Sequence, residues 1–281
     1  MAIKLIAVDV DGTLLNSRGE LAAETRRAVA EAAEAGVFVA LGTGRALDEC
    51  AALLQALPEL RYVIGCTGAS VCDVRTGEEL FADPLPLPVV RELYRKLEPI
   101  DCLLELMSEG HVYVEPARLA RARDYDTMYY LDTILASRTP AELGAMIDTW
   151  EKPVSKIHLF CRDAAECDRA RALVPQEGLL VLSSIPQNLE INTAASSKGV
   201  GLRMLAQHLG LRREETMAIG DNVNDAGMLR EAGYPTVVAN ANPAVLPLAR
   251  YLTESNDAFG AANAIRRALR GEVEEMRREK E

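Results

Sequence analysis

The sequence predicts an α/β protein with a doubly wound parallel sheet and an inserted α+β domain. Short apolar strands alternate with amphipathic helices at both ends of the chain. This rhythm stops near residue 84 and returns near residue 191. The 281 residues, 49% of them hydrophobic, suffice for two domains of ordinary size. We therefore expect a discontinuous core domain, 1–83 plus 191–281, and an inserted domain, 84–190.

The two outer parts of the chain carry the core elements. Each expected strand is a short apolar run rich in branched residues, and each expected helix has an amphipathic pattern. The expected strands are 4–10, 37–41, 62–65, 216–219 and 236–239, and the expected helices are 22–35, 46–57, 200–209 and 226–232. A hairpin over 70–82, turning at Thr76 and Gly77, follows the third strand.

The insert begins at a proline-rich linker that contains Pro84, Pro86 and Pro88. It mixes both kinds of element without the parallel rhythm. The expected helices are 89–97, 140–150 and 164–174, and the expected strands are 103–107, 112–115 and 156–161. Glu109 and Gly110 suit a hairpin turn between two of those strands.

Charge and hydropathy exclude several classes of protein. The 31 basic and 42 acidic residues give a net charge of −11, which repels nucleic acid and anionic membranes. No apolar run approaches the ~20 residues of a membrane span, and Asp9 and Asp11 interrupt the N-terminal run too early for a signal peptide. We expect a cytoplasmic monomer or homodimer without nucleic-acid or membrane partners.

The six cysteines show no CxxC spacing, and none of the three histidines sits near a plausible cysteine partner for a metal. A zinc site is therefore not expected. A chain of this length needs no disulfide staples, so the cysteines are interpreted as small buried apolar residues.

Asp9 and Asp11 follow the first strand, and Gly12 lets the chain turn away. Alternation along a strand would send both carboxylates to the same side. Two carboxylates beside an apolar run need compensation, which a divalent cation such as Mg²⁺ supplies. The alternative is that they are turn formers, a common role of Asp-Gly.

Thr43, Gly44 and Arg45 follow the second strand and open a helix. A hydroxyl and free N–H groups at a helix start can bind a phosphate. The alternative is that Thr43 is an N-cap beside flexible glycines.

Two further polar clusters border core elements. Lys198 precedes a core helix, where it is either a cation beside the aspartates or an ordinary surface lysine. Asp221, Asn222, Asn224 and Asp225 follow the strand 216–219. Asp221 is a candidate metal ligand, with Asn224 and Asp225 orienting the site from behind. The alternative is a helix cap made by Asn222 or Asn224.

All four clusters can meet at one edge of the sheet, because ligands bind beyond the carboxyl ends of parallel strands. In their order, the motifs DVDGT, LGTGR, SSKG and GDNVND resemble those of the haloacid-dehalogenase-like hydrolase superfamily. The GTGR form, the long insertion and the GDNVND ending resemble its Cof-like branch of sugar-phosphate phosphatases, which has a type IIB cap. The resemblance covers the whole chain and implies a Rossmann-like core with an inserted α+β cap domain.

The resemblance also implies roles for individual residues. Asp9 would be the nucleophile that forms an aspartyl-phosphate, and Asp11 the acid and base. Mg²⁺ would be held by the carboxylate of Asp9, the carbonyl of Asp11 and Asp221. The residues expected to bind the phosphoryl group are Thr43, Gly44, Arg45, Lys198 and Asn224. Asn222 and Asp225 would support the site from behind.

The sequence departs from the branch at one place. Members usually show Asn-Gly-Ala after the third strand, whereas this chain has Thr67, Gly68 and Ala69 there. A hydroxyl replaces an amide, so substrate contacts at this position are open.

The expected function is Mg²⁺-dependent hydrolysis of a small phosphorylated metabolite. One alternative is a phosphomutase or phosphotransferase, which would pass the phosphoryl group to a sugar. Another is a catalytically silent protein that binds a sugar phosphate. The sequence does not specify the metabolite.

Overall fold

The computed structural model describes residues 2–125, 127 and 131–272. The chain divides into two compact units, each built from separate stretches of sequence. Unit 1 comprises Met1–Gly44, Ala51–Phe81 and Ser197–Glu281, and unit 2 comprises Arg45–Cys50 and Ala82–Ser196. Each unit has its own sheet and its own hydrophobic core.

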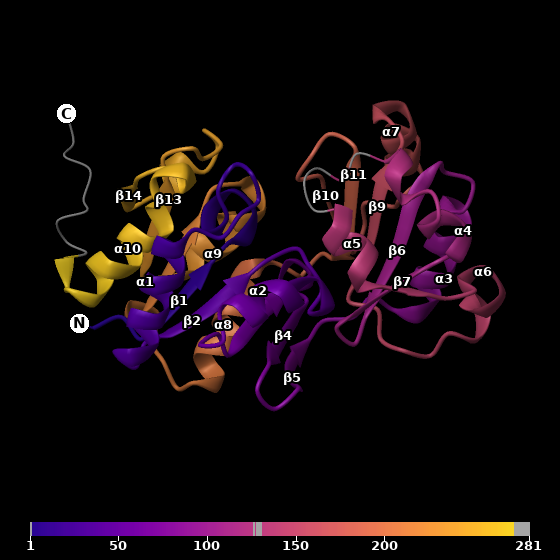
Figure 1. Ribbon diagram of the computed structural model, residues 1–281. Coiled ribbons are helices and arrows are strands. Elements are labelled where there is room, and N and C mark those ends of the chain that lie inside the picture. The colour runs from indigo at the N-terminus through magenta and orange to yellow at the C-terminus, as the bar shows by residue number, and fades with distance from the viewer. Residues whose placement is uncertain (1, 126, 128–130, 273–281) are drawn as a thin grey trace. The chain divides into compact units, whose positions relative to one another are not determined.

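Unit 1 is built on an eight-stranded sheet with the order β14-β13-β12-β1-β2-β3-β4-β5. Its strands are β1 Leu5–Val8, β2 Phe38–Gly42, β3 Tyr62–Gly65, β4 Ser70–Asp73, β5 Glu78–Ala82, β12 Thr216–Gly220, β13 Tyr234–Val238 and β14 Tyr251–Thr253. The six strands from β14 to β3 are parallel, and β4 is antiparallel to β3. In Figure 1 the indigo N-terminal strands and the orange C-terminal elements belong to this one unit.

The order of strands reverses at β1. From β1 the chain proceeds to β2 and β3 on one side, and it later adds β12, β13 and β14 on the other. The carboxyl ends of β1 and β12 therefore border the point where ligands bind in open α/β sheets. Val8 and Ile219 pair directly, so the residues that follow them are neighbours.

Helices cover the sheet of unit 1. The strand residues Leu5 and Ala7 share a core with Leu202 and Leu205 of α8 Lys198–His208, while α9 Ala226–Glu231 packs beside α8. On the other side, α1 Ala23–Glu34 packs against α10 Gly260–Leu269. The short helix α2 Ala51–Ala56 follows β2.

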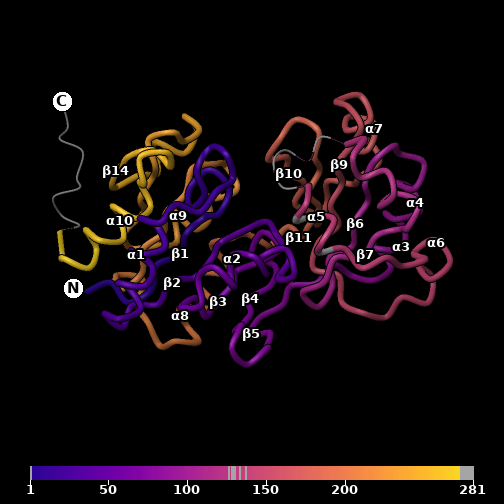
Figure 2. The backbone as a smooth tube through the Cα atoms, in the orientation of Figure 1, coloured from indigo at the N-terminus to yellow at the C-terminus, as the bar shows by residue number. Residues whose placement is uncertain are grey.

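Unit 2 is an α+β unit with a six-stranded sheet in the order β10-β11-β9-β6-β7-β8. Its strands are β6 Cys102–Ser108, β7 His111–Val114, β8 Arg138–Pro140, β9 Lys156–Cys161, β10 Leu179–Leu182 and β11 Asn188–Thr193. Neighbours are antiparallel except β7 and β8. Figure 2 traces β6, β9 and β11 side by side. The helices are α3 Leu87–Leu97, α4 Pro116–Leu119, α5 Leu131–Ser137, α6 Leu143–Met146 and α7 Ala164–Leu173.

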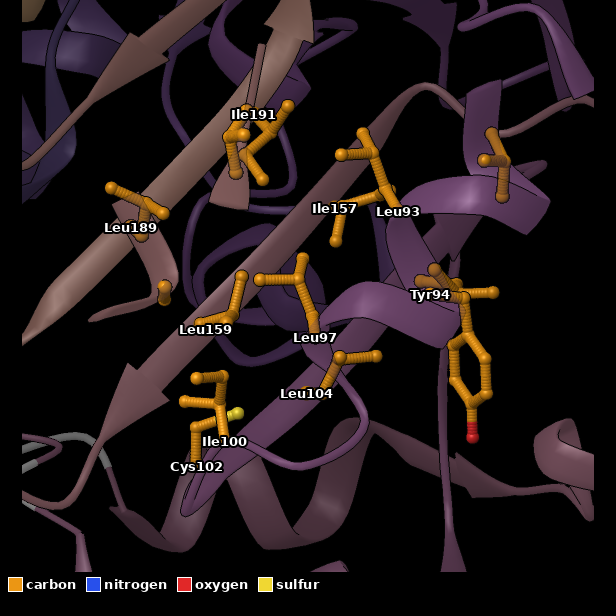
Figure 3. Close-up of a cluster of buried hydrophobic side chains, with 14 of the residues drawn as sticks. Leu93, Tyr94, Leu97, Ile100, Cys102, Leu104, Ile157, Leu159, Leu189 and Ile191 are labelled. Atoms are coloured by element: carbon orange, nitrogen blue, oxygen red, sulfur yellow. The ribbon is translucent and has the colours of Figure 1, made fainter. Parts of the chain in front are cut away.

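One face of the second sheet holds the core of unit 2. Figure 3 shows Leu104 and Leu159 of the sheet beside Leu93 and Leu97 of α3, all of them buried. Alternation along the strands places every second residue on this face. Burial of such side chains stabilises the unit by about 1.5–3 kcal/mol each.

The opposite face of that sheet carries a row of buried titratable side chains. Glu105, His158 and Glu190 lie directly opposite one another on β6, β9 and β11. Arg138 Nε donates to Glu105 Oε1 over 2.6 Å, and Arg138 also donates to Glu49 over 2.9 Å. The side chain of Arg138 is fully buried, so these two carboxylates compensate its charge.

The predicted fold class is confirmed, and most predicted elements are present. Two predicted helices are shorter than expected. The helix predicted over 46–57 begins only at Ala51, because tertiary hydrogen bonds hold the segment before it: Asp48 N–H donates to the carbonyl of Gly110. The helix predicted over 140–150 is reduced to α6 and a 3-10 turn, because residues up to Pro140 pair with β7.

Three strands of unit 2 had no sequence prediction: β8, β10 and β11. β10 is only partly buried. β11 buries Asn188, Glu190 and Asn192, so its alternation of polar and apolar residues does not reveal that both faces are covered. β11 also crosses residue 190, where the sequence predicted a domain boundary.

The cysteines behave as expected. All six are free and buried, as small apolar residues would be. Burial raises the pKa of the Cys102 thiol to about 12, which opposes formation of a reactive thiolate. Within the part of the chain that the structure describes, we find no helix with the length and hydropathy needed to cross a membrane.

Candidate active site

Asp9 begins the site at the carboxyl end of β1. Its N–H donates to the carbonyl of Ile219 on β12 over 2.9 Å, which extends the pairing of the two strands by one residue. The chain then leaves the strand in a wide turn, in which Leu14 N–H donates to the carbonyl of Asp9 over 3.0 Å. The alternation expected to align Asp9 with Asp11 therefore does not apply, because the strand ends at Val8.

Gly12 permits this turn. Its φ is +95°, a conformation that favours glycine, and a Cβ atom there would lie 2.7 Å from Asp221 Oδ2. The turn and Asp221 are thus in contact. Thr13 strengthens the contact, since its hydroxyl donates to Asp221 Oδ1 over 2.7 Å.

Lys198 lies in the interior, unlike a surface lysine. It is the first residue of α8, whose N-cap Ser197 accepts a hydrogen bond from Val200 N–H. The ammonium donates to Asp9 Oδ1 over 2.5 Å and to Asp225 Oδ1 over 2.6 Å. Burial opposes the charge of Lys198, but Asp225 and Asp9 raise its pKa well above the ordinary value.

Asp225 supports its neighbours with its second carboxylate oxygen. Asp225 Oδ2 accepts hydrogen bonds from the N–H groups of Asp221 and Asn222, over 2.9 and 3.0 Å. Asn222 in turn caps this segment, because its Oδ1 accepts from Val223 N–H. Hydrogen bonds from backbone N–H groups to these two side chains therefore fix the loop after β12. Such support orients the residues that would bind a metal.

The site has an excess of negative charge. Asp9, Asp221 and Asp225 face one ammonium, that of Lys198, so the group carries −2 when all are ionised. The pKa of Asp9 lies well above its ordinary value, mainly because the carboxyl is buried and also because Asp225 is close by. The ammonium of Lys198 acts in the opposite direction. The same two causes, burial first and the charge of Asp225 second, raise the pKa of Asp221 to about 6.

The donor set fits a hard divalent cation. Carboxylate oxygens of Asp9, Asp221 and Asp225 all lie within 4.8 Å of one another. Because both oxygens of Asp225 already accept hydrogen bonds, Asp9 and Asp221 are the better candidate ligands. A dication would cancel the charge of −2, and oxygen ligands are those that Mg²⁺ prefers.

The remaining candidate residues differ in their placement. Asp11 lies in the turn and is half-buried. Thr43 is buried, and its N–H donates to the carbonyl of Ile64 over 2.8 Å. Asn224 Oδ1 is buried and accepts no hydrogen bond from any residue that the structure describes. Arg45 belongs to unit 2, where it donates to the carbonyl of Glu49.

Gly44 is the last residue of its stretch of unit 1, directly after Thr43. Because the division between the units falls between Gly44 and Arg45, the expected phosphate contact of Arg45 stays a prediction.

The sequence patterns did not predict two asparagines that lie near the site. Asn240 Nδ2 donates to the carbonyl of Gly12 over 2.8 Å, and Asn240 Oδ1 accepts from Asn256 N–H over 2.8 Å. Asn256 also donates to the carbonyl of Leu15. Asn240 comes shortly after β13, so the rule that directed attention to residues after core strands would have found it.

Known proteins resemble this chain over almost its whole length. The family model described as haloacid dehalogenase-like hydrolase matches residues 6–265. The 5-amino-6-(5-phospho-D-ribitylamino)uracil phosphatase YcsE of Bacillus subtilis is 28% identical, covering 94% of this chain and 95% of its own. Pyridoxal phosphate phosphatase YbhA of Escherichia coli is also 28% identical, covering 94% and 98%.

The fold has solved counterparts. The HAD subclass IIB sugar phosphatase BT4131 superimposes with a TM-score of 0.78, covering 96% of this chain and 99% of its own. Its sequence identity is 20%, so this similarity concerns the fold.

Proposed function

The chain belongs to the haloacid dehalogenase-like hydrolase family, and from this we propose that it is a Mg²⁺-dependent phosphatase for a small phosphate monoester. The observation that carries the proposal is the buried contact of Lys198 with Asp9 and Asp225 beside Asp221. These groups meet at the switch point of the sheet, where such proteins bind ligands. They provide a nucleophile, a cation and the ligands of a metal.

In the first step, an oxygen of Asp9 attacks phosphorus and the bond from phosphorus to the substrate alcohol breaks. Asp11 donates a proton to the departing alkoxide, and an aspartyl-phosphate remains on Asp9. Lys198 holds the attacking carboxylate in place and offsets its charge. Mg²⁺, held by Asp9, the carbonyl of Asp11 and Asp221, would neutralise charge between two anions that must approach each other.

In the second step, water attacks the phosphorus of the aspartyl-phosphate. Asp11 accepts a proton from this water, the bond from phosphorus to Asp9 breaks, and inorganic phosphate leaves. The same side chain thus serves as acid and then as base, which regenerates the starting protonation. Electrostatic positioning dominates phosphoryl transfer.

The phosphoryl oxygens need donors. Thr43 and Gly44 lie at the end of β2, and Lys198 supplies an ammonium. Asn224 and Arg45 are further proposed contacts, because the Nδ2 group of an asparagine and the guanidinium of an arginine are both donors. Asn222 and Asp225 orient the loop after β12.

The proposed substrates are small phosphate esters. The named substrates of YcsE and YbhA are small heterocycles that carry one phosphate, and BT4131 is a sugar phosphatase. The net charge of −11 disfavours nucleic acid as the substrate. A local cation and a metal must therefore attract the phosphate.

Release of inorganic phosphate tests the proposal. Purified protein is offered sugar phosphates, pyridoxal phosphate and ribityl phosphates, with Mg²⁺ or with EDTA. We expect release with Mg²⁺ and its loss with EDTA. Release that gives way to phosphorylated sugar when an acceptor sugar is added would favour a phosphotransferase. Binding of a sugar phosphate without turnover would favour a silent binding protein.

A further inference from the structure

The chain turns after β3 through three successive residues with positive φ. Cys66, Thr67 and Gly68 have φ of 49°, 61° and 91°. A β-branched residue such as threonine strongly disfavours this region. Such strain persists where surrounding contacts over-determine the backbone, and it concentrates at functional sites. All three residues are buried, so the turn is held by its neighbours.

One side of this turn holds Thr43. The N–H of Thr67 donates to the carbonyl of Thr43 over 3.0 Å, while the N–H of Thr43 donates to the carbonyl of Ile64 over 2.8 Å. Both backbone groups of Thr43 are therefore fixed by β3 and the turn. Thr67 adopts its left-handed conformation in the same turn in which its N–H donates to the carbonyl of Thr43.

The other side of the turn meets the start of α8. A Cβ atom on Gly68 would lie 1.9 Å from the carbonyl oxygen of Ser197 and 2.7 Å from the nitrogen of Lys198. A Cβ atom on Gly201, one helical turn further, would lie 2.3 Å from Ile64 Cγ2. The backbone of the turn thus touches the backbone that carries Lys198, with no room for a side chain.

We propose that the Cys66–Gly68 turn is a positioning element that acts through its backbone and sets the spacing between Thr43 and Lys198. The roles of Thr43 and Lys198 in binding the phosphoryl group rest on the proposed function. The contacts of the turn with Thr43 and with the start of α8 do not depend on the proposed function, because they are made by the backbone within unit 1. A displacement of about 1 Å between such groups can lower a rate about 10²-fold.

The variant Gly68→Ala tests the contact with α8. We expect kcat to fall at least tenfold with KM changed less than threefold, because Lys198 is displaced from Asp9. The matched control is Gly36→Ala. Gly36 has a φ of +74°, and a Cβ atom there has nothing within 4 Å. The Gly36→Ala variant places an alanine in a left-handed backbone, as Gly68→Ala does, but without a collision. Its kcat per folded molecule should therefore not change. Equal kcat in the two variants would overturn the proposal.

The variants Thr67→Asn and Thr67→Gly test whether the backbone or the hydroxyl acts. Both residues accept a left-handed backbone and both keep the N–H. We expect kcat and KM within twofold of the wild type for both, and a higher Tm for Thr67→Asn. A KM raised fivefold or more in both variants would show that the hydroxyl binds substrate, which overturns a backbone role. This pair decides the matter if Gly68→Ala does not fold.

A crystal structure of Gly68→Ala separates this proposal from the proposed function. We expect Lys198 Nζ to lie beyond hydrogen-bond distance of Asp9. An unmoved Lys198 would overturn the positioning role, even in an active enzyme. Wild-type protein without phosphatase activity would refute the proposed function, while the displacement could still be measured.

Discussion

Lys198 Nζ lies 2.5 Å from Asp9 Oδ1, although 189 residues separate the two in the sequence. Both side chains are buried, and the same ammonium contacts Asp225. Burying an uncompensated charge is costly, and with three carboxylates near one ammonium the site depends most on Lys198. Stability and activity are therefore linked at this site, and substitutions should separate the two effects.

Lys198→Met should destabilise the protein by about 3–5 kcal/mol near neutral pH, because two buried carboxylates lose their counter-charge. Urea unfolding followed by circular dichroism measures the difference. Lys96→Met is the matched control, since Lys96 pairs with Glu92 on the exposed surface of α3 and should cost less than about 1 kcal/mol. Similar losses in the two variants would contradict the buried bridge.

Asp9→Asn should lower kcat for phosphate release by at least about 10³-fold, because an amide cannot form the aspartyl-phosphate. The Tm should be unchanged or higher, since one of three clustered carboxylates is removed. Asp168→Asn, exposed on α7, should leave both quantities unchanged. An Asp9→Asn enzyme with near wild-type kcat would exclude Asp9 as the nucleophile.

Metal binding should depend on pH. The folded pKa of Asp221 is about 6, above the ordinary 3.8, so the metal-free folded state binds extra protons between about pH 4 and 6. The contribution of this group to stability is therefore greatest at low pH and falls as pH rises through that window. Mg²⁺ needs the ionised carboxylate, so it should raise Tm more near pH 8 than near pH 5.

Thermal melts with Mg²⁺ or EDTA at several pH values measure this effect. At a concentration of 100 times Kd, Mg²⁺ should add about 2.7 kcal/mol near pH 8. Asp221→Asn should abolish the gain at every pH. A gain from Mg²⁺ that is independent of pH, or that survives in Asp221→Asn, would rule out this site.

Asn240→Ala should lower kcat about 10- to 100-fold, because it releases the carbonyl of Gly12 in the turn that follows Asp9. Steady-state kinetics measure it. In the control Asn242→Ala, the lost side-chain hydrogen bond is the one that Asn242 Oδ1 accepts from Ala244 N–H within the same loop, and kcat should not change. If the two variants are equally active, Asn240 does not position the turn.

Arg138→Met should destabilise unit 2 by about 3–5 kcal/mol, because Glu49 and Glu105 lose their partner in the interior. The control Arg95→Met removes an exposed pair with Asp148 and should cost less than about 1 kcal/mol. Urea unfolding compares them. Equal costs would mean that the buried pairs contribute no more than the exposed one.

Local sequence patterns predicted most elements and the identity of the polar clusters. β3 and β9 match their predicted ranges, because an apolar run of that length fits a buried strand. Hydrophobic periodicity did not predict the elements correctly where contacts with distant residues decide the local structure. Residues 46–50 form no α-helix because hydrogen bonds to Gly110 and Arg138, in other parts of unit 2, hold them. β11 was missed because it buries polar side chains.

By itself, the sequence determined that Asp9, Lys198, Asp221 and Asp225 lie at strand ends and helix starts, since hydrophobic periodicity is a local property. Only the tertiary structure decided which of them touch. The sheet order places β12 beside β1, and this pairing brings Asp221 and Asp225 to Asp9. The strain at Thr67 was equally hidden, because a positive φ in threonine is imposed by distant backbone contacts and not by its neighbours in the chain.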